Sequence, residues 1–255
     1  MNEANQIGRQ TALFGFIAEE AQQNRLSVSL NRLFKTAGDD AMMIPMNIRE
    51  DDFYFTLSNM RNAQLRGAFI GAEYQKDAAQ IVDSKSALSQ LCGACDVVLV
   101  KEKKLIGDFI AVRSLFALLE EKGAKKIAVI GAGALAKTIA VANEHYAIAF
   151  YHEYIESLMK MSEGISVEID INRLAQGCDL SGYDAVIDAS TAESLAMVTA
   201  LPALCVDLKS DKVYSPLRQR SGELGRDYLG YSSMLERLTQ NAYNYIKSTK
   251  GQDDK

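Results

Sequence analysis

Several features that mark particular classes of protein are scarce or absent in this sequence of 255 residues. It has three prolines, too few for a rigid Pro-rich linker, so a boundary between domains must lie in a helix or a short loop. No apolar run approaches the roughly 20 residues that a membrane-spanning helix needs. The first residues also lack the basic segment and apolar run of a secretory signal peptide. We therefore expect a cytoplasmic protein without a membrane partner.

Positive charge, cysteine and histidine are also in short supply. The net charge of −5 and the absence of a basic block argue against nucleic acid as a partner. The four cysteines fit a reducing compartment better than a disulfide framework. Cys92 and Cys95 form a C-x-x-C pair, but a second pair is missing and the chain has two histidines. We interpret them as small residues packed at a helix-to-strand junction and expect no metal site.

What the sequence does contain is an alternation of short apolar runs with longer segments of helical spacing. Beta-then-alpha alternation is typical of a parallel sheet with right-handed crossovers, so we expect the α/β fold class. The polar tip 101–104 between two short apolar runs predicts a hairpin. The expected strands are 11–17, 41–48, 67–72, 96–101, 126–130, 147–151, 166–169, 185–188 and 203–207, and the expected helices are 26–36, 51–65, 74–91, 110–122, 134–144 and 234–247.

The clearest functional motif starts at Gly131. The sequence Gly131-Ala132-Gly133-Ala134-Leu135-Ala136 follows an expected strand, opens an expected helix and is followed about 20 residues later by another strand. The first glycine permits a tight turn, the second lets backbone approach a pyrophosphate, and Ala136 keeps the helix close to the strand. The amides of the helix start then face the phosphates. The alternative is a Rossmann unit that keeps its glycines for packing and binds nothing.

The end of the next strand bears on which dinucleotide binds. Glu153 stands where the adenosine ribose would lie, and a carboxylate there accepts hydrogen bonds from a 2′-hydroxyl and repels a 2′-phosphate. This favours NAD over NADP slightly, although Glu153 is equally explained as a solvated surface acid. NAD, NADP and the absence of any cofactor all remain open.

Several segments, in order along nearly the whole chain, resemble motifs of the shikimate/quinate dehydrogenase family. The resemblance implies two domains. An N-terminal α/β substrate-type domain would comprise residues 1–107, with a C-terminal helix in 234–255 packing back on it, and a Rossmann-like NAD(P)-binding domain would comprise residues 108–233. The resembling segments are 15–17 (G-x-P-I), 26–35 (S-x-S-P…H-N-x-x-F), 67–75 (G-x-N-V-T-x-P-Y-K), 92–98 (G-A-V-N-T-V-V), 105–111 (L-x-G-x-N-T-D), 184–190 (D-L-V-I-N-A-T), 214–217 (Y-N-P-L) and 234–235 (M-L).

The departures from the family pattern occur at the positions that take part in the reaction. The resemblance implies hydride transfer between a nicotinamide and a secondary alcohol, helped by a Lys and an Asp that hold and deprotonate the hydroxyl. Here the Lys position is Gln75 and the Asp position is Ala111. Losing a positioned proton-transfer group typically lowers a rate by about 10²–10⁴. Lys76, one residue along, is a possible substitute or a solvated lysine in the first turn of a helix.

The resemblance also marks binding positions. Ser27 keeps a hydroxyl and is either a substrate contact or a helix N-cap, and Tyr214 is either a substrate contact or a tyrosine packed at the domain junction. Asp96 and Phe109 replace family asparagines, and Gln240 lies two residues from the family's late glutamine. His152 stands in the family's phosphate-recognising N-R-T, which reads Tyr151-His152-Glu153 here. Including these, the expected cofactor contacts are Gly131, Gly133, Ala134, Ala136, His152, Glu153 and Ser190.

Two hypotheses about function follow. The first is a shikimate dehydrogenase-like NAD(P)-dependent oxidoreductase with an altered active site, acting on a CH–OH group of a small molecule other than shikimate. The second is a catalytically inactive binding or scaffold protein that keeps the fold. A methylene-folate-type dehydrogenase explains the domain order but not segment 214–217. Monomer and homodimer remain open.

Overall fold

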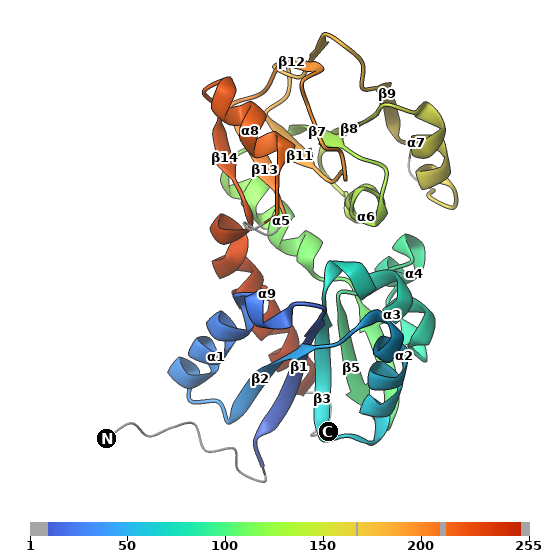
Figure 1. Cartoon of the computed structure of the whole chain (residues 1–255), viewed down its shortest axis with the longest axis vertical. Helices are drawn as coiled ribbons and strands as arrows, with labels where there is room; N and C mark the ends of the chain where they lie inside the picture. The colour runs from blue at the N-terminus through green and yellow to red at the C-terminus, as the bar shows by residue number, and fades with distance from the viewer. Residues whose placement is uncertain (1–9, 167, 210–212, 251–255) are drawn as a thin grey trace. The chain divides into compact units, whose positions relative to one another are not determined.

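The computed structural model describes residues 10–166, 168–209 and 213–250. The chain divides into two compact units (Figure 1). Unit 1 comprises residues 1–110 and 237–255, and unit 2 comprises residues 111–236. Unit 1 is thus built from both ends of the chain, and unit 2 from the uninterrupted segment between them.

Unit 1 is organised around a mixed sheet with the strand order β2-β1-β3-β5-β6-β4. β1 runs parallel to both β2 and β3, whereas β5 is antiparallel to β3 and β6. The strands are β1 (Ala12–Ala18), β2 (Ala41–Asn47), β3 (Leu65–Ile70), β4 (Ser84–Lys85), β5 (Val97–Lys101) and β6 (Lys104–Asp108). The helices are η1 (Ala21–Gln23), α1 (Leu26–Ala37), α2 (Glu50–Asn59), η2 (Met60–Asn62), η3 (Ala72–Tyr74), α3 (Gln75–Ile81) and α4 (Ala87–Cys92).

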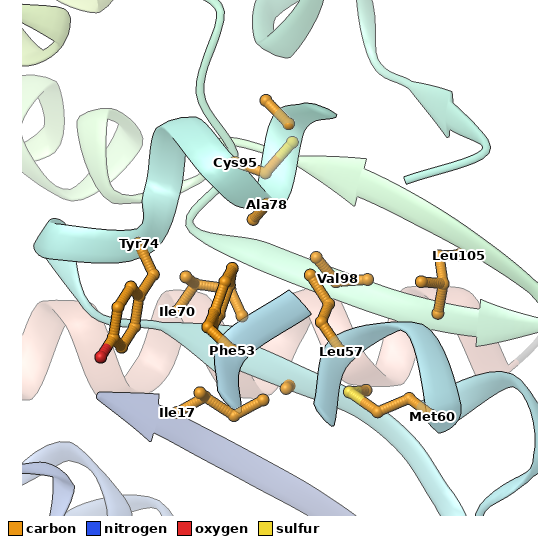
Figure 2. Packing of buried hydrophobic residues seen from close by; sticks show 12 residues of the cluster. Ile17, Phe53, Leu57, Met60, Ile70, Tyr74, Ala78, Cys95, Val98 and Leu105 are labelled. Atoms are coloured by element: carbon orange, nitrogen blue, oxygen red, sulfur yellow. The ribbon is translucent and has the colours of Figure 1, made fainter. Parts of the chain in front are cut away.

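A hydrophobic cluster joins α2 to the sheet of unit 1 (Figure 2). Phe53 and Leu57 lie one turn apart on α2, which places both side chains on its buried face. The ring of Phe53 stacks on that of Tyr74 with the centroids 4.3 Å apart. Ile17 and Ile70 approach the same cluster from neighbouring parallel strands. This packing fixes the segment that follows β3.

Two expected helices are wrong in their extent. The helix expected at 51–65 ends at Asn59, because η2 and then β3 follow it. The helix expected at 74–91 is interrupted after Ile81, where Ser84 and Lys85 pair with β6 as a short edge strand. Ser86 then caps α4, its hydroxyl accepting the Ser89 amide at 3.2 Å. The hairpin at 101–104 is confirmed, with Glu102 and Lys103 at φ 50° and 60°.

The helix α9 (Tyr231–Lys250) returns the chain to unit 1. Asn241 donates from its Nδ2 to the Ile110 carbonyl at 2.7 Å. The Tyr243 hydroxyl and the Lys247 ammonium both reach Asp39, at 2.7 and 2.6 Å. The last turns of the described chain therefore hold the loop between α1 and β2.

Unit 2 has a Rossmann-like parallel sheet in the order β14-β13-β11-β7-β8-β9, which confirms the expected α/β fold class. The strands are β7 (Lys126–Ile130), β8 (Ala147–His152), β9 (Asp170–Arg173), β11 (Ala185–Asp188), β13 (Leu204–Asp207) and β14 (Asp227–Leu229), with β10 (Cys178–Asp179) and β12 (Val198–Ala200) paired apart from them. The helices are α5 (Ala111–Glu121), α6 (Ala134–Ala142), α7 (Ile155–Ser162) and α8 (Pro216–Glu223).

Most strand predictions for unit 2 are confirmed, and one is misplaced. The strand expected at 166–169 is β9, which begins at Asp170, while residue 167 of that prediction lies outside the described residues. The helices α7 and α8 and the strand β14 were not predicted. Within the part of the chain that the structure describes, no helix combines the length and the apolar character needed to cross a membrane.

Candidate functional site

The turn between β7 and α6 requires glycine at its first position. Gly131 has a φ of 128°, a conformation that L side chains rarely adopt. A Cβ on Gly131 would lie 2.5 Å from the Ala189 carbonyl oxygen and 2.9 Å from the Ser190 nitrogen. The amide of Gly131 donates to the Tyr151 carbonyl at 2.8 Å. The turn is therefore pressed against the backbone that follows β11.

Gly133 differs because the space above it is open. It is exposed and forms the N-cap of α6, and a Cβ built there meets nothing within 4 Å. Since glycine has no side chain, it cannot cap the first amides of α6, and these carry the positive end of the helix dipole. Ala134 begins the helix and Ala136 is completely buried, as a close helix-to-sheet contact needs. This geometry fits a pyrophosphate that approaches over Gly133.

The carboxyl end of β8 places His152 and Glu153 on the next strand from this turn. The Nδ1 of His152 accepts the Tyr154 amide at 3.1 Å, and the imidazole is half-buried. Glu153 is exposed. Tyr154 is 64% exposed, and its ring centroid lies 5.9 Å from that of His152. The adenosine half of a dinucleotide would meet these groups, because β8 is the neighbour of β7 on this side of the turn.

On the other side of the turn, Ser190 is fixed by a buried acid. The amide and the hydroxyl of Ser190 both donate to Asp188 Oδ1, at 2.9 and 2.6 Å. The Ser190 hydroxyl in turn accepts the Ala192 amide at 3.2 Å. Asp188 ends β11 and pairs in register with Ile130, the last residue before the turn. The loop after β11 is therefore held next to the Gly131–Gly133 turn.

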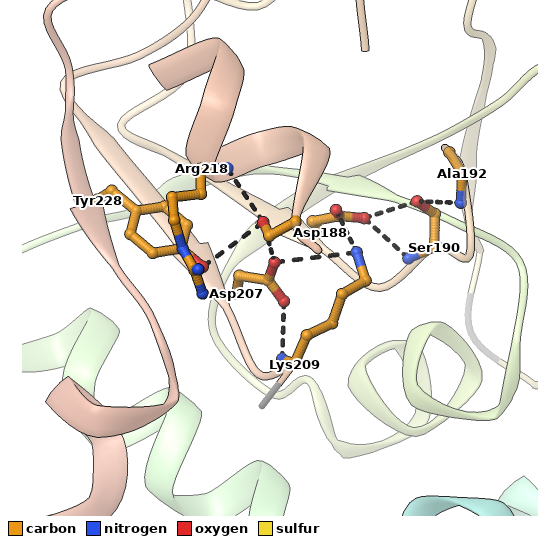
Figure 3. A network of polar contacts seen from close by, with 8 residues as sticks. Asp188, Ser190, Ala192, Asp207, Lys209, Arg218 and Tyr228 are labelled. Carbon is orange, nitrogen blue, oxygen red and sulfur yellow. Dashed lines mark hydrogen bonds and ion pairs between the residues drawn. The ribbon is translucent and has the colours of Figure 1, made fainter. Parts of the chain in front are cut away.

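Three charged residues that the sequence did not single out as a site complete this edge (Figure 3). Asp188 and Asp207 end the neighbouring strands β11 and β13 and are 1% and 0% exposed. The Lys209 ammonium bonds Asp188 and lies 3.8 Å from Asp207 Oδ2. Asp207 also accepts the Lys209 amide at 2.7 Å and the Ser215 hydroxyl at 2.5 Å. Two buried carboxylates thus share one ammonium.

In unit 1, the residue at the family's lysine position opens α3. The Gln75 side chain donates from Nε2 to the Ile70 carbonyl at 3.3 Å and is half-buried. The backbone carbonyl of Gln75 accepts the Cys95 amide at 2.9 Å. Lys76 is exposed in the same turn. Ala111, at the family's aspartate position, is the first residue of α5 in unit 2. Neither Gln75 nor Ala111 carries an ionisable side chain.

Asp96 and Phe109 lie where β5 begins and β6 ends. Asp96 is 7% exposed, and its Oδ1 accepts the Ile110 amide at 2.7 Å. The Phe109 ring is buried at 2% exposure. A second acid, Asp108, was missed by the sequence prediction; it accepts the Phe109 amide at 2.7 Å and the Ser86 hydroxyl at 2.5 Å. Both carboxylates hold the backbone that leads out of β6.

Ser27 lies within the first turn of α1 rather than capping it. The N-cap alternative for Ser27 is wrong, because Asn24 Oδ1 accepts the Leu26 amide at 2.7 Å and Arg25 occupies the cap position. Ser27 is only 3% exposed, and its hydroxyl has no hydrogen-bond partner among the described residues. A buried hydroxyl normally has such a partner, so this oxygen is an unsatisfied polar atom of unit 1.

The remaining predicted substrate contacts are at the surface. Tyr214 is 58% exposed, and its hydroxyl donates to Gln219 Oε1 at 2.6 Å. Gln240 is exposed on α9 and donates to Asn244 one turn later, at 2.9 Å.

The C-x-x-C pair lies at the predicted junction, with Cys92 ending α4 and Cys95 preceding β5. Neither cysteine forms a disulfide, both are buried, and burial raises the pKa of Cys95 to about 11. A thiol with so high a pKa is a poor nucleophile and a poor metal ligand at neutral pH. Across residues 10–166, 168–209 and 213–250, no cluster of His, Cys, Asp and Glu has the makeup of a metal site.

Comparison with known proteins gives a consistent set of relatives, although no family model matches the sequence. The chain is 25% identical over 137 residues to the shikimate dehydrogenase (NADP(+)) of Pyrococcus furiosus, covering 52% of this chain and 50% of that protein. It is 25% identical over 221 residues to that of Thermococcus kodakarensis, covering 83% and 80%. The first of these matches thus spans about half of the relative's length.

Solved structures of the same kind share the fold. A shikimate dehydrogenase in complex with NADP+ aligns with a TM-score of 0.75 at 17% identity, covering 94% of this chain and 91% of that one. Ligand-free 5-ketofructose reductase of Gluconobacter sp. aligns with a TM-score of 0.71 at 18% identity, covering 91% of each. The names of the two curated relatives carry NADP(+), so they support neither the preference for NAD nor the absence of a cofactor.

Proposed function

We propose that this chain, a divergent relative of the shikimate dehydrogenases, is an NAD(P)-dependent oxidoreductase with an altered active site and a small-molecule substrate other than shikimate. One observation carries the proposal. The turn at Gly131 and Gly133 keeps the geometry of a phosphate-binding loop, whereas the positions of the family's proton-transfer pair hold Gln75 and Ala111. A phosphate-binding turn of this geometry is explained by a bound dinucleotide, and the lost pair by a changed substrate.

Residues of unit 2 have separate tasks in binding the dinucleotide. The amides at the start of α6 hold the pyrophosphate, and the open face of Gly133 lets it approach. Glu153 and His152 meet the adenosine ribose, and Ser190 borders the other half. When bound, the nicotinamide gives or accepts the hydride.

Residues of unit 1 define a substrate preference. The Ser27 hydroxyl is buried without a partner and supplies one hydrogen bond to a ligand. Phe109 and Phe69, both buried at 5% exposure or less, replace polar family residues and favour a less hydroxylated molecule. Gln75 can hydrogen-bond a substrate oxygen but cannot exchange a proton with it near neutral pH. We therefore expect turnover of shikimate to be lower than the family's by about 10²–10⁴.

Cofactor titration tests the first part of the proposal. The protein is titrated with NADH and with NADPH while nicotinamide fluorescence is followed. Micromolar or tighter binding of either form supports the proposal. A folded protein that binds neither form contradicts it and favours the inactive binding or scaffold protein.

A substrate panel tests the second part. Shikimate, quinate and less hydroxylated cyclic alcohols and ketones are compared under steady-state conditions with the cofactor that binds. Turnover of shikimate or quinate at the family's normal level contradicts the altered active site. Cofactor binding without hydride transfer to any member of the panel favours the inactive alternative, which the loss of both ionisable side chains also supports.

A further inference from the structure

An ion cluster at the carboxyl edge of the unit 2 sheet has no role in the functions discussed so far (Figure 3). Asp188 and Asp207 each have side chains that are 0% exposed, whereas the side chain of Lys209 is 20% exposed. With both acids ionised and the lysine protonated, the cluster carries one net negative charge. Because only Lys209 reaches the surface, a ligand at this edge meets the ammonium first and the carboxylates behind it.

The register of the sheet places the cluster beside the Gly131–Gly133 turn. Asp188 pairs with Ile130, and Asp207 pairs with Asp188, so the acids lie one and two strands away from β7. Neighbouring strands are about 4.8 Å apart. Ser190, bonded to Asp188, packs its backbone against Gly131. The cluster and the turn are therefore parts of one edge.

The direction of the dinucleotide across this edge follows from the sheet order. The adenosine ribose belongs at the end of β8, on one side of β7. The nicotinamide half then extends to the other side, over the ends of β11 and β13. These are the strands that carry Asp188, Asp207 and, just beyond, Lys209.

We propose that Asp188, Asp207 and Lys209 set the ratio of the affinities of this protein for the oxidised and the reduced dinucleotide. The inference rests on the proposed function and adds residues that determine the direction of the redox reaction. The oxidised nicotinamide ring carries a positive charge and the reduced ring is neutral. Lys209 therefore disfavours the oxidised form, and the two carboxylates behind it favour that form, while the reduced form is almost unaffected. Because the cluster carries one net negative charge, it favours the oxidised form and, with it, oxidation of an alcohol over reduction of a carbonyl substrate.

A charge series in the full-length protein tests the inference. Lys209→Met makes the cluster charge −2, Asp188→Asn makes it 0, and the double variant returns it to −1. The measured quantity is the ratio of the dissociation constants of the oxidised and reduced dinucleotide, from calorimetry and nicotinamide fluorescence. The ratio should fall by up to about tenfold in Lys209→Met, because removal of one positive charge strengthens the binding of the oxidised form and leaves that of the reduced form almost unchanged. It should rise in Asp188→Asn and return to within about threefold of wild type in the double variant.

Controls separate charge from packing. Lys209→Arg keeps the positive charge and should leave the ratio unchanged even if both affinities weaken. Since Lys209→Met leaves two buried carboxylates unpaired, its folding is checked by circular dichroism. If it does not fold, Asp188→Asn and the double variant still test the order of the ratios.

The outcomes distinguish this inference from the proposed function. Folded variants whose two affinities change in parallel, with a constant ratio, show a purely structural cluster and overturn the inference alone. Wild-type protein that binds neither form overturns the proposed function and the inference with it. A ratio that follows the cluster charge supports both.

Discussion

Gly131 and Gly133 differ in the room that the fold leaves for a side chain. Gly131 is limited by the fold, because a Cβ would lie 2.5 Å from the Ala189 oxygen. Gly133 has open space around it, so no neighbouring atom of the described residues excludes a side chain there. The two positions therefore allow stability and binding to be tested separately.

Alanine at each glycine should separate the two effects. We expect Gly133→Ala to keep the melting temperature of wild type within about 1–2 °C and to weaken NADH or NADPH binding about tenfold or more, because a methyl group obstructs the pyrophosphate. Gly131→Ala should lower the melting temperature, through strain and backbone overlap. Thermal denaturation and cofactor titration of both variants are the measurements. Unchanged cofactor affinity in Gly133→Ala would place the dinucleotide elsewhere.

Restoring the lost proton-transfer residues tests the altered active site. We expect Gln75→Lys combined with Ala111→Asp to produce measurable oxidation of shikimate. Each single variant should give less, because such groups act as a unit. The assay is reduction of the bound dinucleotide followed by absorbance. A folded double variant that is as inactive as wild type would show that the rest of the substrate pocket has diverged too.

Asp83 predicts a pH dependence of stability. The Arg61 side chain, at 3.1 Å, and the Leu105 amide, at 2.7 Å, hold the pKa of Asp83 below its usual value. A lowered pKa in the folded state stabilises it above the unfolded value near 3.9, and this contribution disappears as the pH falls through the lowered pKa. Asp83→Asn should therefore reduce the free energy of unfolding at pH 7 by about 1 kcal/mol or less, because the pair is partly exposed to solvent. Urea denaturation at pH 7 and pH 3 should show the difference shrinking; an equal difference at both values would count against this assignment.

At the residue scale, the sequence predicted local structure correctly where the residues concerned are close together in the chain. The glycine motif is local, so its strand, turn and helix could be predicted from spacing. The cluster of Asp188, Asp207 and Lys209 could not, because the register of β11 and β13 brings it together. The sequence did contain a signal, because two otherwise apolar strands each end in an acid. These strands are Ala185–Asp188 and Leu204–Asp207.

Among the elements, buried strands were predicted more reliably than helices. The runs 126–130 and 185–188 match β7 and β11 residue for residue. The expected helix 74–91 failed because apolar spacing continues on both sides of a break. The polar residues Asp83 to Ser86 marked that break, and pairing of Ser84 with Ile106 in β6 turned it into an edge strand. Tertiary pairing therefore outweighed local periodicity.

Helix α2 offers a matched pair of aromatic residues for testing its packing. Phe53 is 2% exposed and stacks on Tyr74, whereas Phe55 on the same helix is 71% exposed. We expect Phe53→Ala to lower the free energy of unfolding by about 3–4 kcal/mol, and Phe55→Ala to change it by less than about 0.5 kcal/mol. Urea denaturation of both variants measures the difference. Similar effects of the two substitutions would contradict the packing of this helix.

In the whole molecule, the stability of unit 1 depends on α9, which is distant in sequence from the rest of that unit. Ile246 on α9 is 1% exposed, and Tyr243 and Lys247 bond Asp39. Truncation of Ile246 should therefore destabilise unit 1 without changing the residues of unit 2 that we propose to bind the dinucleotide. We expect Ile246→Ala to cost about 2–4 kcal/mol and to leave cofactor affinity unchanged at low temperature. Loss of cofactor affinity in the folded variant would show that the two units do not function separately.

The contact between α9 and Asp39 also sets an order for biosynthesis. Tyr243 and Lys247 follow Asp39 by 204 and 208 positions, so the ribosome makes the partners of this loop long after the loop itself. The uninterrupted segment 111–236 is fully synthesised before them. Co-translational folding should therefore run against the N-to-C direction, with unit 2 complete first and unit 1 completed only when α9 has been made.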